Sequence, residues 1–225
     1  MNLIYYGTFK DINENTIRVE FYDDSTTSSP KEVILSSNPV RVYYEQDNIV
    51  SSFKKSGASI TLLVPNILSN LYSSEYNGVK VKIYKNGEMF WFGYVTPNIY
   101  TQNYNDEYDE LTIECNDTIT LLSDKKVDYE DIANAFSFRE IIYKILDEID
   151  PDKEINNVIV HDLLGNDIIS KYGVIVRNFY DEIEEPATLE EIMDGILKYL
   201  NLTMLQWGNS YYLMSFPDLA KYNVA

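Results

Sequence analysis

Few residues in this chain could do covalent or metal chemistry. There is one cysteine, Cys115, and one histidine, His161. A nucleophilic cysteine needs a neighbouring base, and a zinc site needs several Cys or His ligands. Nothing in the sequence brings Cys115 and His161 together. Because Cys115 falls on the apolar face of an expected strand, we interpret it as a buried structural thiol and expect no disulfide, metal or cofactor.

Carboxylates are abundant, with 36 Asp and Glu residues. Two acids flanking a sugar bond would make a glycosidase, but in so acidic a chain pairs arise by chance. The acidic run at 106–110 lacks the alternating order of a calcium-binding EF-hand loop, so a solvated loop is favoured. The sequence contains none of the glycine-rich motifs that bind phosphates or dinucleotides, and it lacks the Gly-x-Ser-x-Gly motif of serine hydrolases. The sequence therefore indicates a protein that is not an enzyme.

The charge restricts the partners. The formal net charge is −18, shared between −7 in residues 1–125 and −11 in residues 126–225. Specific binding to nucleic acid or to an anionic membrane needs a basic face, and none is visible. No apolar run is long enough to span a bilayer. The 20 tyrosines suit half-buried strands, and they equally suit contact surfaces, so both interpretations stay open.

A β-hairpin is the clearest element of the sequence. Residues 79–83 alternate apolar and polar side chains, Asn86-Gly87 supplies the positive φ angles of a type I′ turn, and residues 88–95 alternate again. We expect Lys80 and Lys82 on the solvent-exposed face of the strand, and Trp91 and Phe92 in the barrel wall. We assign Gly93 to a close approach of two backbones. The next strand, 111–115, leads to Asp117, which we assign to the turn after it.

Other strands of the first half follow the same period. We expect a hairpin of residues 4–9 and 16–22, a strand at 58–64 that Pro65 ends, and one helical turn within 65–76. Two further strands, 31–35 and 40–44, are expected to flank a turn at Ser36-Ser37-Asn38-Pro39. Short strands at this spacing predict an antiparallel β-barrel or sandwich over residues 1–125.

The second half, residues 126–225, has helical periodicity. Ser137 to Glu140 and Thr188 to Glu191 read as capping boxes, each followed by an apolar stripe. The stripes are predicted to pack on a sheet made of 158–160, 173–176 and a final hairpin, 202–206 and 211–216, with a turn at Gly208-Asn209. The fold class is thus α+β, with an N-terminal barrel or sandwich followed by a smaller α+β domain with two capped helices and a hairpin.

The order of these elements resembles bacteriophage tail hub and baseplate proteins, in particular those of phages or prophages of Bacteroides-type bacteria. The segments that carry the resemblance are YYGTFKD (5–11), IRVEFY (17–22), SSNPVRV (36–42), VKIYKNG (81–87), FGYV (92–95) with Pro97, and LTIECNDTITLL (111–122). The paired helices with a terminal hairpin also fit. Many such proteins are longer, so a shortened member or a fragment stays open.

The resemblance implies a structural subunit of the virion tail, made in the host cytoplasm. Such hubs form closed rings, often trimers and possibly hexamers here, and dock other tail proteins around the channel through which DNA passes. An acidic wall would keep that DNA from sticking. The residues expected to matter are structural: Asn86, Gly87, Trp91, Phe92, Gly93 and Asp117.

Two other functions are compatible with the composition. Trp91, Trp207 and the tyrosines could stack on sugars in a carbohydrate-binding, receptor-binding module, which would require exposed rings. A tail-associated hydrolase fragment would instead require an acid or histidine in a cleft with a perturbed pKa.

Overall fold

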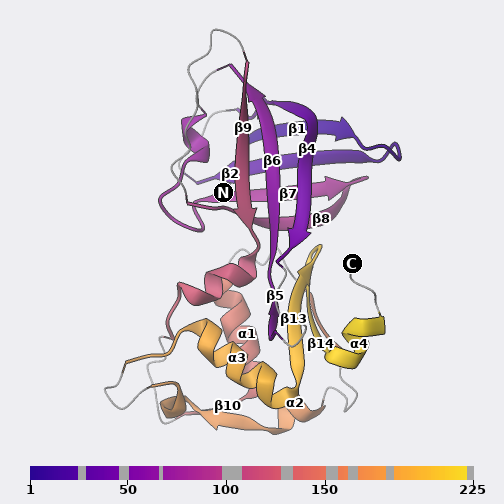
Figure 1. Ribbon diagram of the computed structural model, residues 1–225. Coiled ribbons are helices and arrows are strands. Elements are labelled where there is room, and N and C mark those ends of the chain that lie inside the picture. The colour runs from indigo at the N-terminus through magenta and orange to yellow at the C-terminus, as the bar shows by residue number, and fades with distance from the viewer. Residues whose placement is uncertain are drawn as a thin grey trace. The chain divides into compact units, whose positions relative to one another are not determined.

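The computed structural model describes residues 1–24, 29–45, 51–65, 68–97, 108–127, 134–150, 157–161, 167–180 and 185–221. The chain forms two compact units, which are described separately. Unit 1 consists of residues 1–45 and 55–117, and unit 2 consists of residues 46–54 and 118–225. The predicted α+β class is confirmed, because unit 1 is built almost wholly of strands and unit 2 combines helices with strands (Figure 1).

One eight-stranded sheet makes up unit 1, in the order β3-β1-β2-β7-β8-β9-β6-β4. The predicted hairpins, the strand ended by Pro65 and the helical turn before β7 are all present. The bounds are β1 (Asn2–Lys10), β2 (Thr16–Asp23), β3 (Lys31–Glu32), β4 (Ile34–Tyr44), β6 (Ser56–Val64), η1 (Ser69–Leu71), β7 (Val79–Lys85), β8 (Glu88–Val95) and β9 (Asp109–Asn116).

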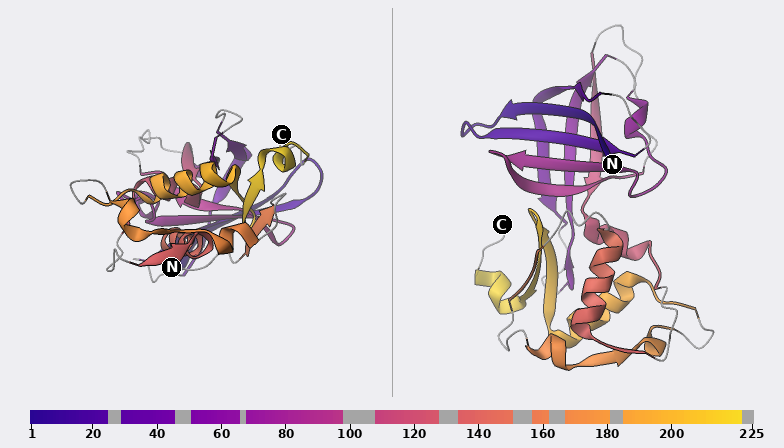
Figure 2. Two further views of the ribbon diagram at one scale, coloured as in Figure 1. Left: turned by 90° about the horizontal axis from the view of Figure 1, so that it is seen from below. Right: turned by 180° about the vertical axis from the view of Figure 1, so that it is seen from behind.

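The sheet closes on itself through residues 31–44. At the start of this stretch, β3 pairs in parallel with β1, and the Val33 N–H donates to the Tyr6 carbonyl at 2.8 Å. The rest of the stretch, β4, pairs antiparallel with β6. Since β3 and β4 are the two ends of the strand order, their continuity at Val33 makes the sheet barrel-like. In Figures 1 and 2, β4, β6 and β9 cross β1, β2, β7 and β8 steeply.

The turn predicted at residues 36–39 is wrong. Both flanking segments pair with the same strand, Leu35 with Leu62 and Val40 with Ile60, so residues 36–39 oppose Thr61 alone. They form a wide bulge within one strand. Ser, Asn and Pro are turn residues, but they also suit a bulge, where a ladder hydrogen bond is already lost. Local composition cannot separate the two cases.

The interior of unit 1 is filled by the apolar side of each strand. Val19, Phe21, Ile60, Val81 and Ile113 have no exposed surface or almost none. They belong to one continuous cluster that also contains Leu71 from η1 and the buried Cys115. The period-two pattern therefore predicted this core correctly.

Unit 2 contains a four-stranded sheet in the order β11-β14-β13-β5 and a separate two-stranded sheet, β10-β12. The two helices α1 and α3 each contribute an apolar stripe to the core. The bounds are β5 (Phe53–Lys54), η2 (Thr118–Ser123), β10 (Ala135–Ser137), α1 (Phe138–Ile149), β11 (Asn157–His161), α2 (Asp167–Lys171), β12 (Gly173–Ile175), η3 (Val176–Phe179), α3 (Leu189–Leu200), β13 (Leu202–Trp207), β14 (Ser210–Ser215) and α4 (Phe216–Lys221).

Both capping boxes are confirmed. The Ser137 hydroxyl accepts from the Glu140 N–H, and the Glu140 carboxylate accepts from the Ser137 N–H; Thr188 and Glu191 do the same for α3. Each box satisfies N–H groups that have no partner within the helix. The stripe predicted for α1 is fully buried, and that of α3 is buried except for Leu200, which is partly exposed.

The predicted sheet of the second half needs two corrections. Residues 173–175 form β12, which pairs with β10 and lies outside the four-stranded sheet, and Val176 begins η3. The fourth strand is instead β5, which pairs in parallel with β13. Ser52 Oγ donates to the Asp194 carboxylate at 2.6 Å, and Thr203 Oγ1 donates to the Ser51 carbonyl at 2.9 Å. These bonds fix a segment from the first half of the sequence in unit 2.

The predicted domains, 1–125 and 126–225, were placed at the change of periodicity. The compact units differ in that residues 46–54 and 118–125 belong to unit 2. The division into two domains at residue 125 stays a prediction.

Candidate functional site

The tip of the Asn86-Gly87 hairpin is tied to its neighbouring strand. Asn86 and Gly87 have φ angles of 53° and 87°, in the left-handed region that a type I′ turn requires. The Asn86 N–H donates to the Thr16 carbonyl at 2.8 Å, and Asn86 Oδ1 accepts from the Thr16 N–H at 2.9 Å. Asn86 thus shapes its own turn and also holds the start of β2.

Trp91 and Asp117 meet at Ser56, the first residue of β6. Trp91 Nε1 donates to Ser56 Oγ at 3.1 Å, and Ser56 Oγ donates to the Asp117 carboxylate at 2.8 Å. The Ser56 N–H also donates to that carboxylate, at 2.6 Å, while the Asp117 N–H donates to the Ser56 carbonyl. All three residues are buried. Burial, followed by the charge of Asp117, raises the pKa of Tyr44 to about 12.

Gly93 lies where two backbones approach closely. A β-carbon added there would come within 2.2 Å of the Asn116 carbonyl oxygen and 2.4 Å of the Trp91 ring. Gly93 therefore lets β8 bend onto the end of β9 beside the Trp91–Ser56–Asp117 cluster. The structure brings Trp91, Gly93 and Asp117 together, and it leaves Asn86 and Gly87 at the hairpin tip.

The prediction that one face of β7 is exposed to solvent is wrong. Lys80 and Lys82 are 2% and 9% exposed, and Phe92 is fully buried. The Lys80 ammonium lies 5.7 Å from the centroid of the Phe92 ring, and Phe92 packs edge-on against Tyr94 at 5.6 Å. A lysine stem can cover apolar surface. The alternation of apolar and polar residues thus predicts correctly that one face of β7 is buried, but it does not show that the face with Lys80 and Lys82 is buried as well.

A polar cluster that sequence reasoning missed lies on the same sheet. Glu20 is 8% exposed and accepts from Arg18 Nε and from the Tyr22 hydroxyl, both at 2.6 Å. The Lys82 ammonium lies 4.8 Å from the Tyr22 ring centroid. Burial and then the Glu20 carboxylate raise the pKa of Tyr22 well above its usual value. The spacing 18, 20, 22 on one strand face was the available signal.

The described residues provide little for catalysis. Burial raises the pKa of the Cys115 thiol far above its usual range, so the thiolate that would be the nucleophile is disfavoured. Among the residues that the structure describes, no group of His, Cys, Asp and Glu side chains could hold a metal ion. The side chain of His161, and the acidic residues Asp106, Glu107, Asp181, Glu182 and Glu184, lie outside the described residues.

The carbohydrate-binding alternative loses Trp91, one of the two tryptophans that it would use. Trp91 is 4% exposed and already bonded to Ser56, so it cannot stack on a sugar, although Trp207 is 48% exposed.

Within the described ranges, no helix is both long and apolar enough to cross a membrane.

Comparison with solved structures finds several matching chains, and two of them are tail proteins. One is a tail protein from Neisseria meningitidis MC58, with TM-score 0.48 and 11% identity, which covers 78% of this chain and 49% of its own. The other is the 43 kDa tail protein of prophage MuSo2 from Shewanella oneidensis, with TM-score 0.44 and 14% identity, which covers 79% of this chain and 55% of its own. This chain therefore spans about half the length of each. No protein-family model and no curated protein matches the sequence.

Replacing Gly93 with alanine should destabilise unit 1. The added methyl group must displace the Asn116 backbone or the Trp91 ring, and overpacking of this kind costs about 1–3 kcal/mol. The measurement is urea unfolding in a Trp207→Phe background, so that Trp91 fluorescence alone reports. Gly195→Ala is the control for a glycine-to-alanine change without a clash, because a β-carbon at Gly195 meets nothing within 4 Å, and it should not lower stability. Equal unfolding of Gly93→Ala and its parent would contradict the close approach.

Replacing Asp117 with asparagine should also weaken unit 1. The buried carboxylate accepts two hydrogen bonds from Ser56, and bonds to a charged group contribute about 1.5–3 kcal/mol. Glu110→Gln, an exposed carboxylate on β9, provides the control in the same unfolding assay. The prediction fails if the two substitutions shift the urea midpoint by the same amount.

Proposed function

We propose that this chain is a structural subunit of a bacteriophage tail, acting in the hub or baseplate of phages or prophages of Bacteroides-type bacteria. In this role it forms a ring with copies of itself, as a trimer or a hexamer, and docks other tail proteins. The function resides in assembly. Synthesis in the host cytoplasm precedes incorporation into the virion tail.

One observation supports this proposal most strongly. The strand segments on which the sequence resemblance rests, 5–11, 17–22, 36–42, 81–87, 92–95 and 111–116, all contribute to one closed sheet. The opening hairpin is β1–β2, the Asn-Gly hairpin is β7–β8, and the segment that contains Asp117 is β9 with the start of η2. Buried polar residues of this sheet bond one another, as Trp91, Ser56 and Asp117 do, and are thus occupied in holding it together.

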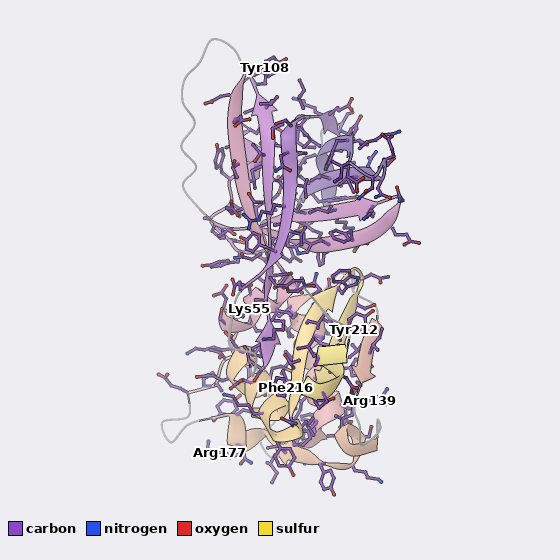
Figure 3. All side chains as sticks on the ribbon, turned by 45° about the vertical axis from the view of Figure 1, so that its right-hand side comes forward. Lys55, Tyr108, Arg139, Arg177, Tyr212 and Phe216 are labelled. Carbon is purple, nitrogen blue, oxygen red and sulfur yellow. The ribbon has the colours of Figure 1, made fainter. Side chains whose placement is uncertain are left out.

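Surface composition agrees with a role in assembly. Tyr108, just before β9, is 56% exposed, and Tyr172 and Tyr199 of unit 2 are 54% and 69% exposed (Figure 3 labels Tyr108). Tyrosine is enriched in protein interfaces because it combines apolar area with a hydrogen-bonding hydroxyl. Ring formation would cover such residues, since each subunit in a closed ring buries two different faces.

The acidic balance fits a channel for DNA. Unit 1 and unit 2 both carry a net negative charge, −7 and −11. An acidic wall repels phosphates, so DNA would pass through the ring without specific binding.

Native mass spectrometry of the purified chain tests self-assembly. Over a range of protein concentrations, and at two salt concentrations, we expect a discrete trimer or hexamer. A population of dimers, or a strict monomer at every concentration, would contradict a ring formed by this chain alone. A monomer that forms a ring only with a second tail protein would preserve the tail role and assign ring closure to that partner.

A further inference from the structure

Two Asn-Gly pairs occur in this chain, Asn77-Gly78 and Asn86-Gly87. An asparagine followed by glycine readily loses ammonia from its side chain, because glycine has no β-carbon to shield its backbone nitrogen. Asn77 lies in the turn before β7, Asn86 lies in the turn after it, and both residues are exposed. The two pairs have the same local chemistry, so any difference in their reactivity must come from the fold.

Loss of ammonia from an Asn-Gly pair proceeds in two steps. The backbone nitrogen of the glycine gives up its proton and attacks the asparagine Cγ. The new C–N bond closes a cyclic imide, and the Cγ–Nδ2 bond breaks as ammonia leaves with that proton. Water then opens the imide at either of its two carbonyls, which leaves aspartate or isoaspartate. An amide that hydrogen bonds hold in another direction must first be released by local opening.

Asn86 is held at three points. Its N–H donates to the Thr16 carbonyl and its Oδ1 accepts from the Thr16 N–H, while its Nδ2 donates to Asn15 Oδ1 at 2.8 Å. The Asn15 amide is fixed in turn, because Asn15 Nδ2 donates to the Asp11 carboxylate at 2.9 Å. This last bond is the largest cause of the lowered pKa of Asp11, so the carboxylate stays ionised at neutral pH and keeps accepting it.

Asn77 lacks these restraints. Its side chain makes no hydrogen bond to any residue that the structure describes, and its φ angle is outside the left-handed region. The Gly78 N–H, whose nitrogen must attack, donates to the Glu75 carbonyl at 3.2 Å, the upper limit of the usual range. The amide of Asn77 is therefore free to turn toward the peptide that follows it.

We propose that Asn77 is a deamidation site of the folded protein, and that the bonds to Thr16 and Asn15 protect Asn86 from the same reaction. Conversion of Asn77 adds a negative charge to an exposed turn. Conversion of Asn86 would put a carboxylate oxygen against Asn15 Oδ1, an acceptor, and so release the hairpin tip from β2. The inference rests on unit 1 alone, so it holds whether or not the chain forms a ring.

Peptide mapping of the folded full chain tests the proposal, after incubation at mildly alkaline pH in heavy-oxygen water. Each conversion during incubation takes up heavy oxygen, and trypsin separates the two sites because it cleaves after Lys80 and Lys85. Asn77 should convert about tenfold faster than Asn86 or more, because the two side-chain bonds of Asn86 must break before it reacts. In guanidinium chloride, where the fold is lost, the two sites should convert at similar rates.

A matched pair of variants tests the cause of the protection. Asn15→Ala removes the acceptor of Asn86 Nδ2 and should raise the rate at Asn86 about threefold or more, with the rate at Asn77 unchanged. Asn13→Ala makes the same change in the same turn, but the exposed Asn13 side chain bonds none of the described residues, so both rates should stay those of the parent. Thermal unfolding verifies that each variant is folded. If Asn15→Ala does not fold, the comparison of native and denatured wild-type chain carries the test.

Four results would overturn the proposal. They are no conversion at Asn77 in the folded chain, equal rates at the two sites in the folded chain, a rate difference that guanidinium chloride leaves unchanged, or a rate at Asn86 that a folded Asn15→Ala variant does not raise. The third result would assign the difference to neighbouring residues in the sequence, and the fourth would remove Asn15 from the protection.

Discussion

The closure of the unit 1 sheet is the constraint on which the rest of the structure depends. One stretch of chain, residues 31–44, pairs with β1 at its start and with β6 along its length. Strands at a sheet edge present unpaired N–H and C=O groups, and closure removes them. Gly7 permits the join, since a β-carbon there would lie 2.9 Å from Leu35 and 3.1 Å from the Val33 carbonyl. The bulge at 36–39 then lets the same strand continue along β6.

The closed sheet also sets where the chain leaves unit 1. It leaves after Glu45, returns at Lys55 and leaves again after Asp117. These exits are bonded together, because the Glu45 N–H donates to the Lys55 carbonyl and Ser56 bonds to Asp117 through backbone and side chain. A buried carboxylate is costly unless its acceptor sites are filled. The Ser56 N–H and hydroxyl donate to the Asp117 carboxylate, and Trp91 in turn donates to the Ser56 hydroxyl.

Local rules predicted the elements whose signals are local. Both capping boxes, the Asn86-Gly87 turn and the apolar stripes of α1 and α3 follow from spacing alone. The pairing of strands that are far apart in the sequence was harder to predict. The bulge at 36–39 was predicted as a turn because its composition fits both, and the burial of Lys80 depends on neighbours that alternation does not report. The two-residue strand β5 is too short to show any period. Of the candidate residues, Trp91 and Asp117 were assigned to the barrel wall and to a turn, but the role of Ser56 as their common hydrogen-bond partner carried no sequence signal.

The proposed tail function combines a closed sheet, exposed tyrosines and an acid excess into one account, in which the chain acts by assembling. Electron cryo-microscopy of the assembled particle tests that account most directly. The proposed tail function predicts a closed ring whose bore is lined by acidic side chains. The exposed tyrosines should lie at contacts between subunits or with neighbouring tail proteins. An open or irregular assembly, or a ring with a neutral or basic bore and its acidic residues outside, would contradict it.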